Sequence, residues 1–223
     1  MTIINYSTGL YSIPESAKFL ANTPPLTNGN KVNYSRLRYW ISTSVPHIES
    51  PIYPTRKRLV SFVNLISMRM VAVLRSRGVK LKEIKATETW LKKEFGIAYP
   101  LASKGLWTCD SHIYIKFKEN LLAASKYGQK AMDFIRDWLS EVELDMTFDM
   151  DDIANSWTPY QGISINPIIQ FGEPCISGTR IPTSSIWSNR IAGDSPETIA
   201  KAHDIDVALV VNAIDWEKRL VAT

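Results

Sequence analysis

Residues 61–78 read SFVNLISMRMVAVLRSRG, a long helical pattern that is apolar on more than one side. A helix of this kind is usually buried, because a surface helix keeps one polar face. Gly78 follows the last apolar residues and is typical of a residue that ends a helix in the left-handed conformation. This stretch predicts a buried helix and indicates a mainly α fold with small β elements.

Residues 80–95 continue with a second helical pattern. Its apolar residues recur at spacings of three, seven and four, which places them on one stripe of a helix. The stripe consists of Leu81, Ile84, Leu91 and Phe95, and it is surrounded by Lys80, Lys82, Lys85, Lys92 and Lys93. The segment therefore predicts a helix with one buried face and basic flanks.

Two shorter helices are expected upstream. In the segment 11–21, Ser12 is placed to cap a helix and Glu15 to complete a capping box. The segment 34–42, YSRLRYWIS, is short, aromatic and basic. On a helix its Leu37 and Ile41 fall one turn apart, and we expect Trp40 to join the core while Arg36 points outward. Two such helices resemble a helix-turn-helix.

Charge divides the chain into two unequal parts. Residues 1–96 hold 15 Lys and Arg against 5 Asp and Glu, a formal charge of +10, and the remainder holds 11 against 17, a charge of −6. The basic part favours a polyanionic partner. Cys109 and Cys175 are far apart and belong to no paired motif, which fits a reducing compartment. With no apolar run of membrane length and no signal-like N-terminus, we expect a cytoplasmic protein.

The middle of the chain, residues 98–154, predicts a connector between two domains at 1–97 and 155–223. Residues 106–117 alternate around Asp110 and Ser111 and indicate a hairpin. A helix is expected over about 129–140, with Met132, Ile135, Trp138 and Leu139 on its apolar face. Acidic residues follow: Glu141, Glu143, Asp145, Asp149, Asp151 and Asp152. We interpret them as a solvated connector in preference to a metal site, because they lack a recognised ligand spacing.

The C-terminal segment combines short β-branched runs with three helical patterns. We expect helices at about 183–191, 196–203 and 207–220. Gly193 is placed to end the first, Asp194 or Ser195 to cap the second, and Asp206 to cap the third. The apolar stripe predicted for the last helix is Val207, Val210, Val211, Ile214 and Val221. These parts are typical of a winged-helix-like, three-helix domain.

The segment 173–183, EPCISGTRIPT, precedes those helices. Gly178 permits a left-handed backbone, Pro182 fixes φ at a helix entrance, and Arg180 offers donors to a carbonyl or carboxylate. The glycine spacing and the terminal Lys-Ser/Thr of a phosphate loop are absent. We interpret the segment as a rigid turn.

Two family resemblances follow from these motifs. The order of the first two helices, a basic loop and "LRSRGVKLKEIK" resembles the DNA-binding domain of MerR-type regulators, a winged helix-turn-helix, although the stretch between the first two helices is longer than in that motif. The resemblance implies that the second helix enters the major groove and that the following loop contacts the DNA backbone. The DNA-binding residues that it implies are Arg36, Arg38, Tyr39, Arg56, Lys57 and Arg58.

The C-terminal segment resembles the DUF433 family, which carries a GTRIP signature matched here by Gly178, Thr179, Arg180, Ile181 and Pro182. Members include VapB-type antitoxins. The combined resemblance implies an antitoxin that neutralises a PIN-like ribonuclease toxin and represses its own operon as a homodimer on operator DNA. Arg180 and Arg190 are the candidate toxin contacts, where they could oppose an acidic nuclease site, and a role in supporting the fold is the alternative for each.

Two other classes stay open as alternatives. A MerR-like regulator without a toxin would need an effector pocket, for which the aromatic middle region is a candidate. A metal nuclease would need the acidic stretch, but no nucleophile–base pair supports it and the histidines at 47, 112 and 203 are scattered. We therefore expect a non-enzymatic protein without cofactor or metal.

Overall fold

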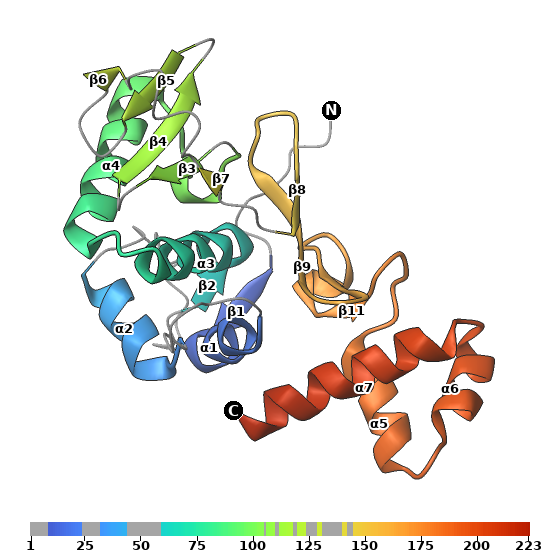
Figure 1. Ribbon diagram of the computed structural model, residues 1–223. Coiled ribbons are helices and arrows are strands. Elements are labelled where there is room, and N and C mark those ends of the chain that lie inside the picture. Colours follow the sequence, from blue (N-terminus) through green and yellow to red (C-terminus); the bar gives the residue numbers. More distant parts are fainter. Residues whose placement is uncertain are drawn as a thin grey trace.

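The computed structural model describes residues 9–23, 32–43, 59–104, 106–109, 112–117, 120–123, 129–130, 140–141 and 145–223. Its helices are α1 (Ile13–Asn22), α2 (Tyr34–Ser42), α3 (Phe62–Ser76), α4 (Leu81–Phe95), α5 (Thr183–Ile191), α6 (Pro196–His203) and α7 (Val207–Ala222), with short 3-10 turns η1 (Pro100–Ala102) and η4 (Gln170–Gly172). Its strands are β1 (Leu10–Ser12), β2 (Leu59–Ser61), β3 (Leu106–Cys109), β4 (His112–Phe117), β5 (Asn120–Ala123), β6 (Gln129–Lys130), β7 (Ser140–Glu141), β8 (Met146–Phe148), β9 (Ala154–Tyr160), β10 (Ile163–Ile165) and β11 (Cys175–Ile176). The expectation of a mainly α chain with small β elements is confirmed (Figure 1).

The four N-terminal helices form where the sequence predicts them. Ser12 caps α1 and forms the reciprocal capping box with Glu15. Antiparallel pairing of β1 with β2, from Leu10 opposite Ser61 to Ser12 opposite Leu59, joins the two segments that lead into α1 and α3. Every residue of α3 from Phe62 to Leu74 is buried, as its apolar sides predict, and Gly78 takes a φ of +88° just after the helix. This helix is the centre of the N-terminal core (Figure 1).

The middle of the chain is more extended than predicted. The hairpin is confirmed, because β3 pairs antiparallel with β4 from Leu106 opposite Ile115 to Cys109 opposite His112. Five strands join in the order β6-β5-β4-β3-β7. The ends predicted for the helix at 129–140 are wrong, since Gln129 and Ser140 begin strands β6 and β7. Residues 131–139 lie outside the described part of the chain.

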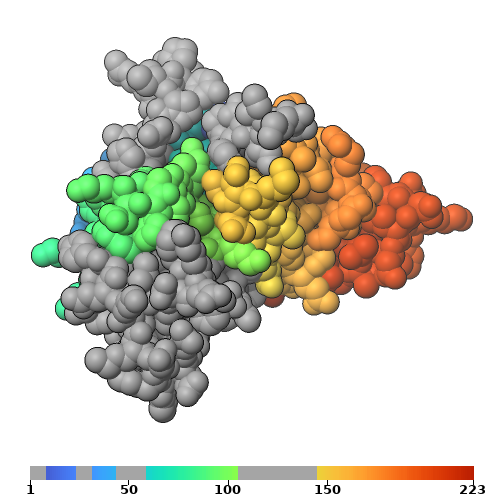
Figure 2. Space-filling model, turned by 90° about the horizontal axis from the view of Figure 1, so that it is seen from above, coloured from blue at the N-terminus to red at the C-terminus, as the bar shows by residue number. Residues whose placement is uncertain are grey.

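The C-terminal part contains a four-stranded antiparallel sheet, ordered β11-β10-β9-β8, and the three predicted helices. Ser195 caps α6 and Asp206 caps α7, while Gly193 takes a φ of +108° after α5. In the space-filling view these helices (red) form one end of the molecule (Figure 2). The local signals at 193, 195 and 206 thus identified the true helix ends.

The apolar stripe predicted for α7 is only partly correct. Val210 and Ile214 are buried, but Val207, Val211 and Val221 are exposed. The inward face is completed instead by Ala213 and Trp216. The stripe was wrong because α7 packs against α5 and α1 at once, so its buried face follows those neighbours instead of the line of valines.

Helix α7 also connects the two ends of the chain. Its Trp216 is fully buried, with ring centroids 5.9 Å from Phe19 of α1 and 6.1 Å from Tyr160 of β9. The Lys18 ammonium donates to the Leu220 carbonyl at 2.9 Å. Figure 1 shows the C-terminus next to α1. The buried side chains form one cluster that includes both Tyr11 and Trp216. The domain boundaries expected after residues 97 and 154 therefore stay predictions.

A second contact between distant segments lies at the turn before β11. The hydroxyl of Tyr11, a buried side chain, donates to the Gly172 carbonyl at 3.0 Å. Gly172 has a φ of +89°, and a Cβ placed on it would collide with the Tyr11 hydroxyl and lie 3.1 Å from the Gly9 Cα. Only glycine fits this position, because both its backbone conformation and the space around it exclude a side chain.

We expect Gly172→Ala to lower the free energy of unfolding by about 2 kcal/mol, from left-handed strain and the steric conflict together. Gly178→Ala is the matched control, since Gly178 has a φ of +77° but a Cβ there would meet nothing within 4 Å. The control should cost only about 1 kcal/mol. Urea denaturation of both variants measures the difference, and equal losses would show that the Tyr11 contact does not constrain Gly172.

Candidate nucleic-acid interface

The exposed side of α2 is the first component of the site. Asn33 begins the helix, because its side-chain oxygen accepts a hydrogen bond from the Arg36 backbone N–H at 2.9 Å. Leu37 and Trp40 are buried, which confirms the core position predicted for Trp40. Their burial fixes the rotation of the helix and leaves Arg38 and Tyr39 exposed, with Arg36 half-buried at the border.

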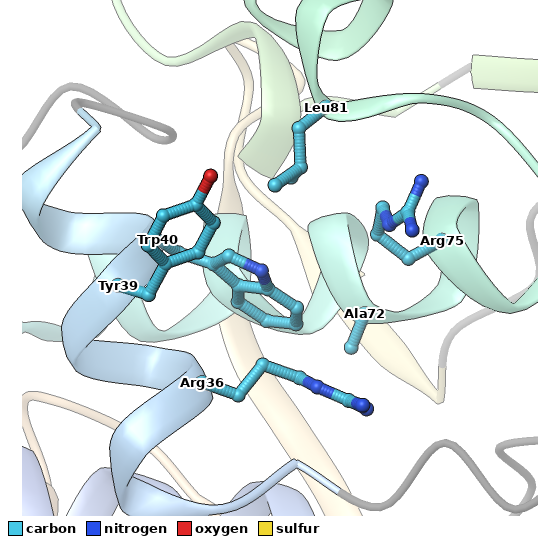
Figure 3. A pocket seen from close by; sticks show the side chains of 6 residues that line it. All are labelled: Arg36, Tyr39, Trp40, Ala72, Arg75 and Leu81. Carbon is cyan, nitrogen blue, oxygen red and sulfur yellow. The ribbon is translucent and has the colours of Figure 1, made fainter.

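A hollow of about 180 Å³ lies between α2, α3 and the start of α4. Its lining consists of Arg36, Tyr39, Trp40, Ala72, Arg75 and Leu81. Figure 3 shows the Arg36 side chain extending from α2 toward α3, with the Trp40 indole as part of the floor. Arg75 is positioned by its own hydrogen bond from Nη1 to the Val79 carbonyl at 2.8 Å. Two guanidinium groups thus border one depression, which has the Trp40 indole in its lining.

Helix α4 adds further cations beside this hollow. The Lys85 ammonium donates to the Thr43 carbonyl, at the C-terminal end of α2, at 3.1 Å. Lys80 and Lys82 are exposed at the start of the same helix. The N-terminus of α4 is held by the Glu83 carboxylate, which accepts from the Lys80 backbone N–H at 3.2 Å. Helices α2, α3 and α4 together present what we call the basic face: Arg36, Tyr39, Arg75, Lys80, Lys82 and Lys85.

The structure brings some of the predicted DNA-binding residues together and separates others. Arg36 and Tyr39 are one turn apart and line the same hollow. Arg38 is exposed but does not line it, because two residues along a helix correspond to a rotation of about 200°. The predicted wing residues, 56–58, lie outside the described part of the chain.

Arg75 and Lys85 were missed as site residues in the sequence reading. Lys85 was recognised only as one of the lysines around an apolar stripe. Arg75 is exposed in the last turn of α3, after the buried run from Phe62 to Leu74, and this position near the helix end was the available signal. The close approach of α4 to the end of α2 depends on tertiary packing, which the spacing of residues within one helix does not reveal.

The GTRIP segment forms the rigid turn that its sequence predicts. Gly178 has the expected left-handed backbone, with a φ of +77°. The Thr179 hydroxyl donates to the Ile176 carbonyl at 2.9 Å and accepts from the Ile181 N–H at 3.1 Å. Pro182 is the residue that precedes α5. The turn ends β11 and directs the chain into the C-terminal helices.

The two predicted toxin contacts are both exposed. Arg180 uses its backbone carbonyl to accept a hydrogen bond from the Gln170 side chain at 2.9 Å. Arg190 donates from Nη1 to the Asp194 carbonyl at 3.2 Å, so it also supports the end of α5. Their side chains are accessible, and a role in binding stays a prediction.

The part of the acidic stretch that follows β8, residues 149–153, forms a turn. One Asp149 carboxylate oxygen accepts from the backbone N–H groups of Asp151 and Ile153, each at 2.9 Å. Among the residues described, no group of three or more His, Cys, Asp or Glu side chains is arranged to hold a metal ion. The described helices include none that is long and apolar enough to cross a bilayer.

Fold and surface together define a mainly helical chain with small antiparallel sheets and cations gathered on three neighbouring helices. Residues 163–216, which are less than half of the chain, match the family described as "Protein of unknown function (DUF433)". This match confirms the resemblance seen around the GTRIP turn. It does not extend to the N-terminal helices.

The crystal structure of Rv2018 from Mycobacterium tuberculosis is similar over almost the whole chain. The TM-score is 0.64 at 16% sequence identity, and the alignment covers 95% of this chain and 100% of Rv2018. At this identity the similarity concerns the fold alone. No curated protein matches the sequence.

Proposed function

We propose that this protein is the DNA-binding antitoxin of a toxin–antitoxin pair, which binds operator DNA through its N-terminal half and a PIN-like ribonuclease toxin through its remaining surface. The observation that carries the DNA-binding part is the basic face, in which α2, α3 and α4 present cations around an exposed tyrosine. The toxin-binding part is supported by the family resemblance of the C-terminal segment.

The basic face suits a duplex for physical reasons. Helix α2 is nine residues long, and its exposed Arg38 and Tyr39 occupy the side away from the core. An α-helix fits the major groove, where arginine pairs with guanine edges. Arg75 and Lys85 flank this helix and suit backbone phosphates, which supply most of the affinity. A homodimer would place two such helices on two half-sites.

The size of the hollow beside α2 favours a phosphate as its occupant over a larger effector molecule. An effector-sensing regulator without a toxin needs a ligand pocket, and typical small-molecule pockets measure roughly 300–1,000 Å³. The hollow at Arg36 and Arg75 is about 180 Å³ and opens onto the basic face. A phosphate group fits such a space better than an effector of ordinary size. The aromatic middle region, the candidate place for an effector pocket, lies outside the part of the chain whose side chains the structure describes, so the effector-sensing function stays the second proposal.

Co-expression with the adjacent reading frame tests the antitoxin proposal directly. Expression of the neighbouring protein alone should arrest growth, and co-expression of the full chain should restore it. A neighbour that leaves growth unaffected, or a toxic neighbour that the chain does not counteract, would contradict the antitoxin function. Restored growth together with binding of the purified chain to the upstream DNA would support both halves of the proposal.

A further inference from the structure

The turn between β10 and β11 exposes two large apolar side chains. Within residues 166–173, Ile168 is 71% exposed and Phe171 is 91% exposed. A phenylalanine ring that is exposed to water does not contribute the favourable free energy that burial of its apolar surface would provide. The side chain therefore contributes little to the stability of the chain that carries it.

The backbone of this turn is unfavourable for the residues that occupy it. Gln170, Phe171 and Gly172 follow one another with φ values of +46°, +54° and +89°. Such values suit glycine, and a bulky residue is rarely found there. Glycine at 171 would suit the backbone better, and no buried contact of the ring compensates. Strain of this kind, held by the surrounding structure, is a recognised mark of functional sites.

Hydrogen bonds hold the turn in this conformation. The Asn166 side chain accepts from the Ile168 N–H at 3.0 Å, and the Gln170 carbonyl accepts from the Glu173 N–H at 3.0 Å. The Gln170 side chain reaches the GTRIP turn, and Tyr11 binds the Gly172 carbonyl. The two apolar side chains are thus presented by a preorganised turn, which lowers the entropic cost of binding a partner.

Negative charge accumulates at the base of the turn. Glu173 is exposed, and its charge contributes to raising the pKa of Glu15 and of Glu217 above the ordinary range, in both cases after the larger effect of burial. The Glu173 carboxylate is therefore near enough to repel both the Glu15 and the Glu217 carboxylate. A cation brought to this position by a partner would relieve the repulsion.

We propose that the turn 166–173 is the toxin-docking element: Phe171 and Ile168 enter an apolar pocket on the toxin, and Glu173 pairs with a lysine or arginine at the rim of that pocket. This inference rests on the proposed function. A second copy of the chain is a poorer occupant, because its matching cations lie mainly in the half that the proposed function assigns to DNA. Buried aromatic anchors of this kind dominate binding energy at interfaces.

Calorimetric titration of the full chain with the purified product of the adjacent reading frame tests this assignment. The variants are Phe171→Gly, Ile168→Ser and Glu173→Gln. Ile191→Ser is the matched control, because Ile191 is 68% exposed on α5, outside the turn. Phe171→Gly should raise the dissociation constant roughly 30-fold. Its Tm should stay unchanged or rise, since glycine relaxes the backbone at this position.

The outcomes separate failure of this inference from failure of the proposed function. Weakened binding by the turn variants, with Ile191→Ser equal to wild type, supports the docking assignment. Unchanged affinity of Phe171→Gly for a bound partner overturns the assignment and leaves the antitoxin function standing. Wild-type chain that does not bind the neighbouring protein overturns both. A chain dimer that sedimentation shows to depend on Phe171 would assign the turn to self-association and contradict the proposal.

Discussion

Replacement of Trp216 by alanine should lower the free energy of unfolding by about 3–5 kcal/mol, the range observed when a large buried aromatic side chain is removed. Trp216 has no exposed surface and contacts rings from both ends of the chain, Phe19 and Tyr160. The cavity left by alanine would lie between α1, α7 and β9, where three elements must move together to close it. Chemical denaturation followed by circular dichroism measures the change.

The matched control for this prediction is Val221→Ala on the same helix. Val221 is 67% exposed, so its replacement should change stability by less than about 0.5 kcal/mol. A small loss for Trp216→Ala, similar to that of Val221→Ala, would mean that α7 does not contribute to a shared core. Unfolding in two separate transitions would likewise contradict a single core that includes Tyr11 and Trp216.

The second large effect is expected at the basic face. The double variant Arg36→Ala/Arg75→Ala should weaken binding to the upstream DNA roughly 100-fold, because each charge-assisted hydrogen bond contributes about 1.5 kcal/mol or more. Both side chains border the same hollow, and neither belongs to the buried core. The melting temperature should therefore stay close to that of the wild type. Fluorescence anisotropy with a labelled duplex measures the affinity.

Lys201→Ala provides the control for charge alone, since Lys201 is an exposed cation on α6, in the part of the chain assigned to the toxin. Its DNA affinity should equal that of the wild type. An equal loss for Lys201→Ala and for the double variant would indicate attraction by overall charge, and the basic face would then have no special role.

Local physical chemistry made the helix ends predictable from sequence. The capping box at Ser12, the left-handed glycine after α3 and the cap at Asp206 each depend on residues within one turn of the chain. The side chain that satisfies a helix end is therefore visible in the sequence. The uniform burial of α3 was predictable for a similar reason, because a helix that is apolar on several sides has few places outside a core.

Tertiary packing decided the features that were not predicted. The inward face of α7 includes Trp216 because two helices and a strand meet it, whereas the valines at 207, 211 and 221 face away. The predicted helix at 129–140 begins and ends in strands, because β6 pairs with β5 and β7 with β3. Arg75 belongs to the candidate site because the hollow that it lines lies between α2 and α3. Each case depends on contacts with residues that are distant in sequence. The periodicity within one segment carries no information about such contacts.

The proposed DNA binding depends most on the contact between the basic face and a duplex, and the salt dependence of the affinity measures that contact directly. Titration of the full chain onto its upstream DNA at increasing salt should give a linear fall of log K with log salt concentration. The slope should be about −0.9 for each phosphate contacted, and it should become shallower in Arg36→Ala/Arg75→Ala. Absent binding, or affinity that does not change with salt, would contradict the assignment of this face to DNA.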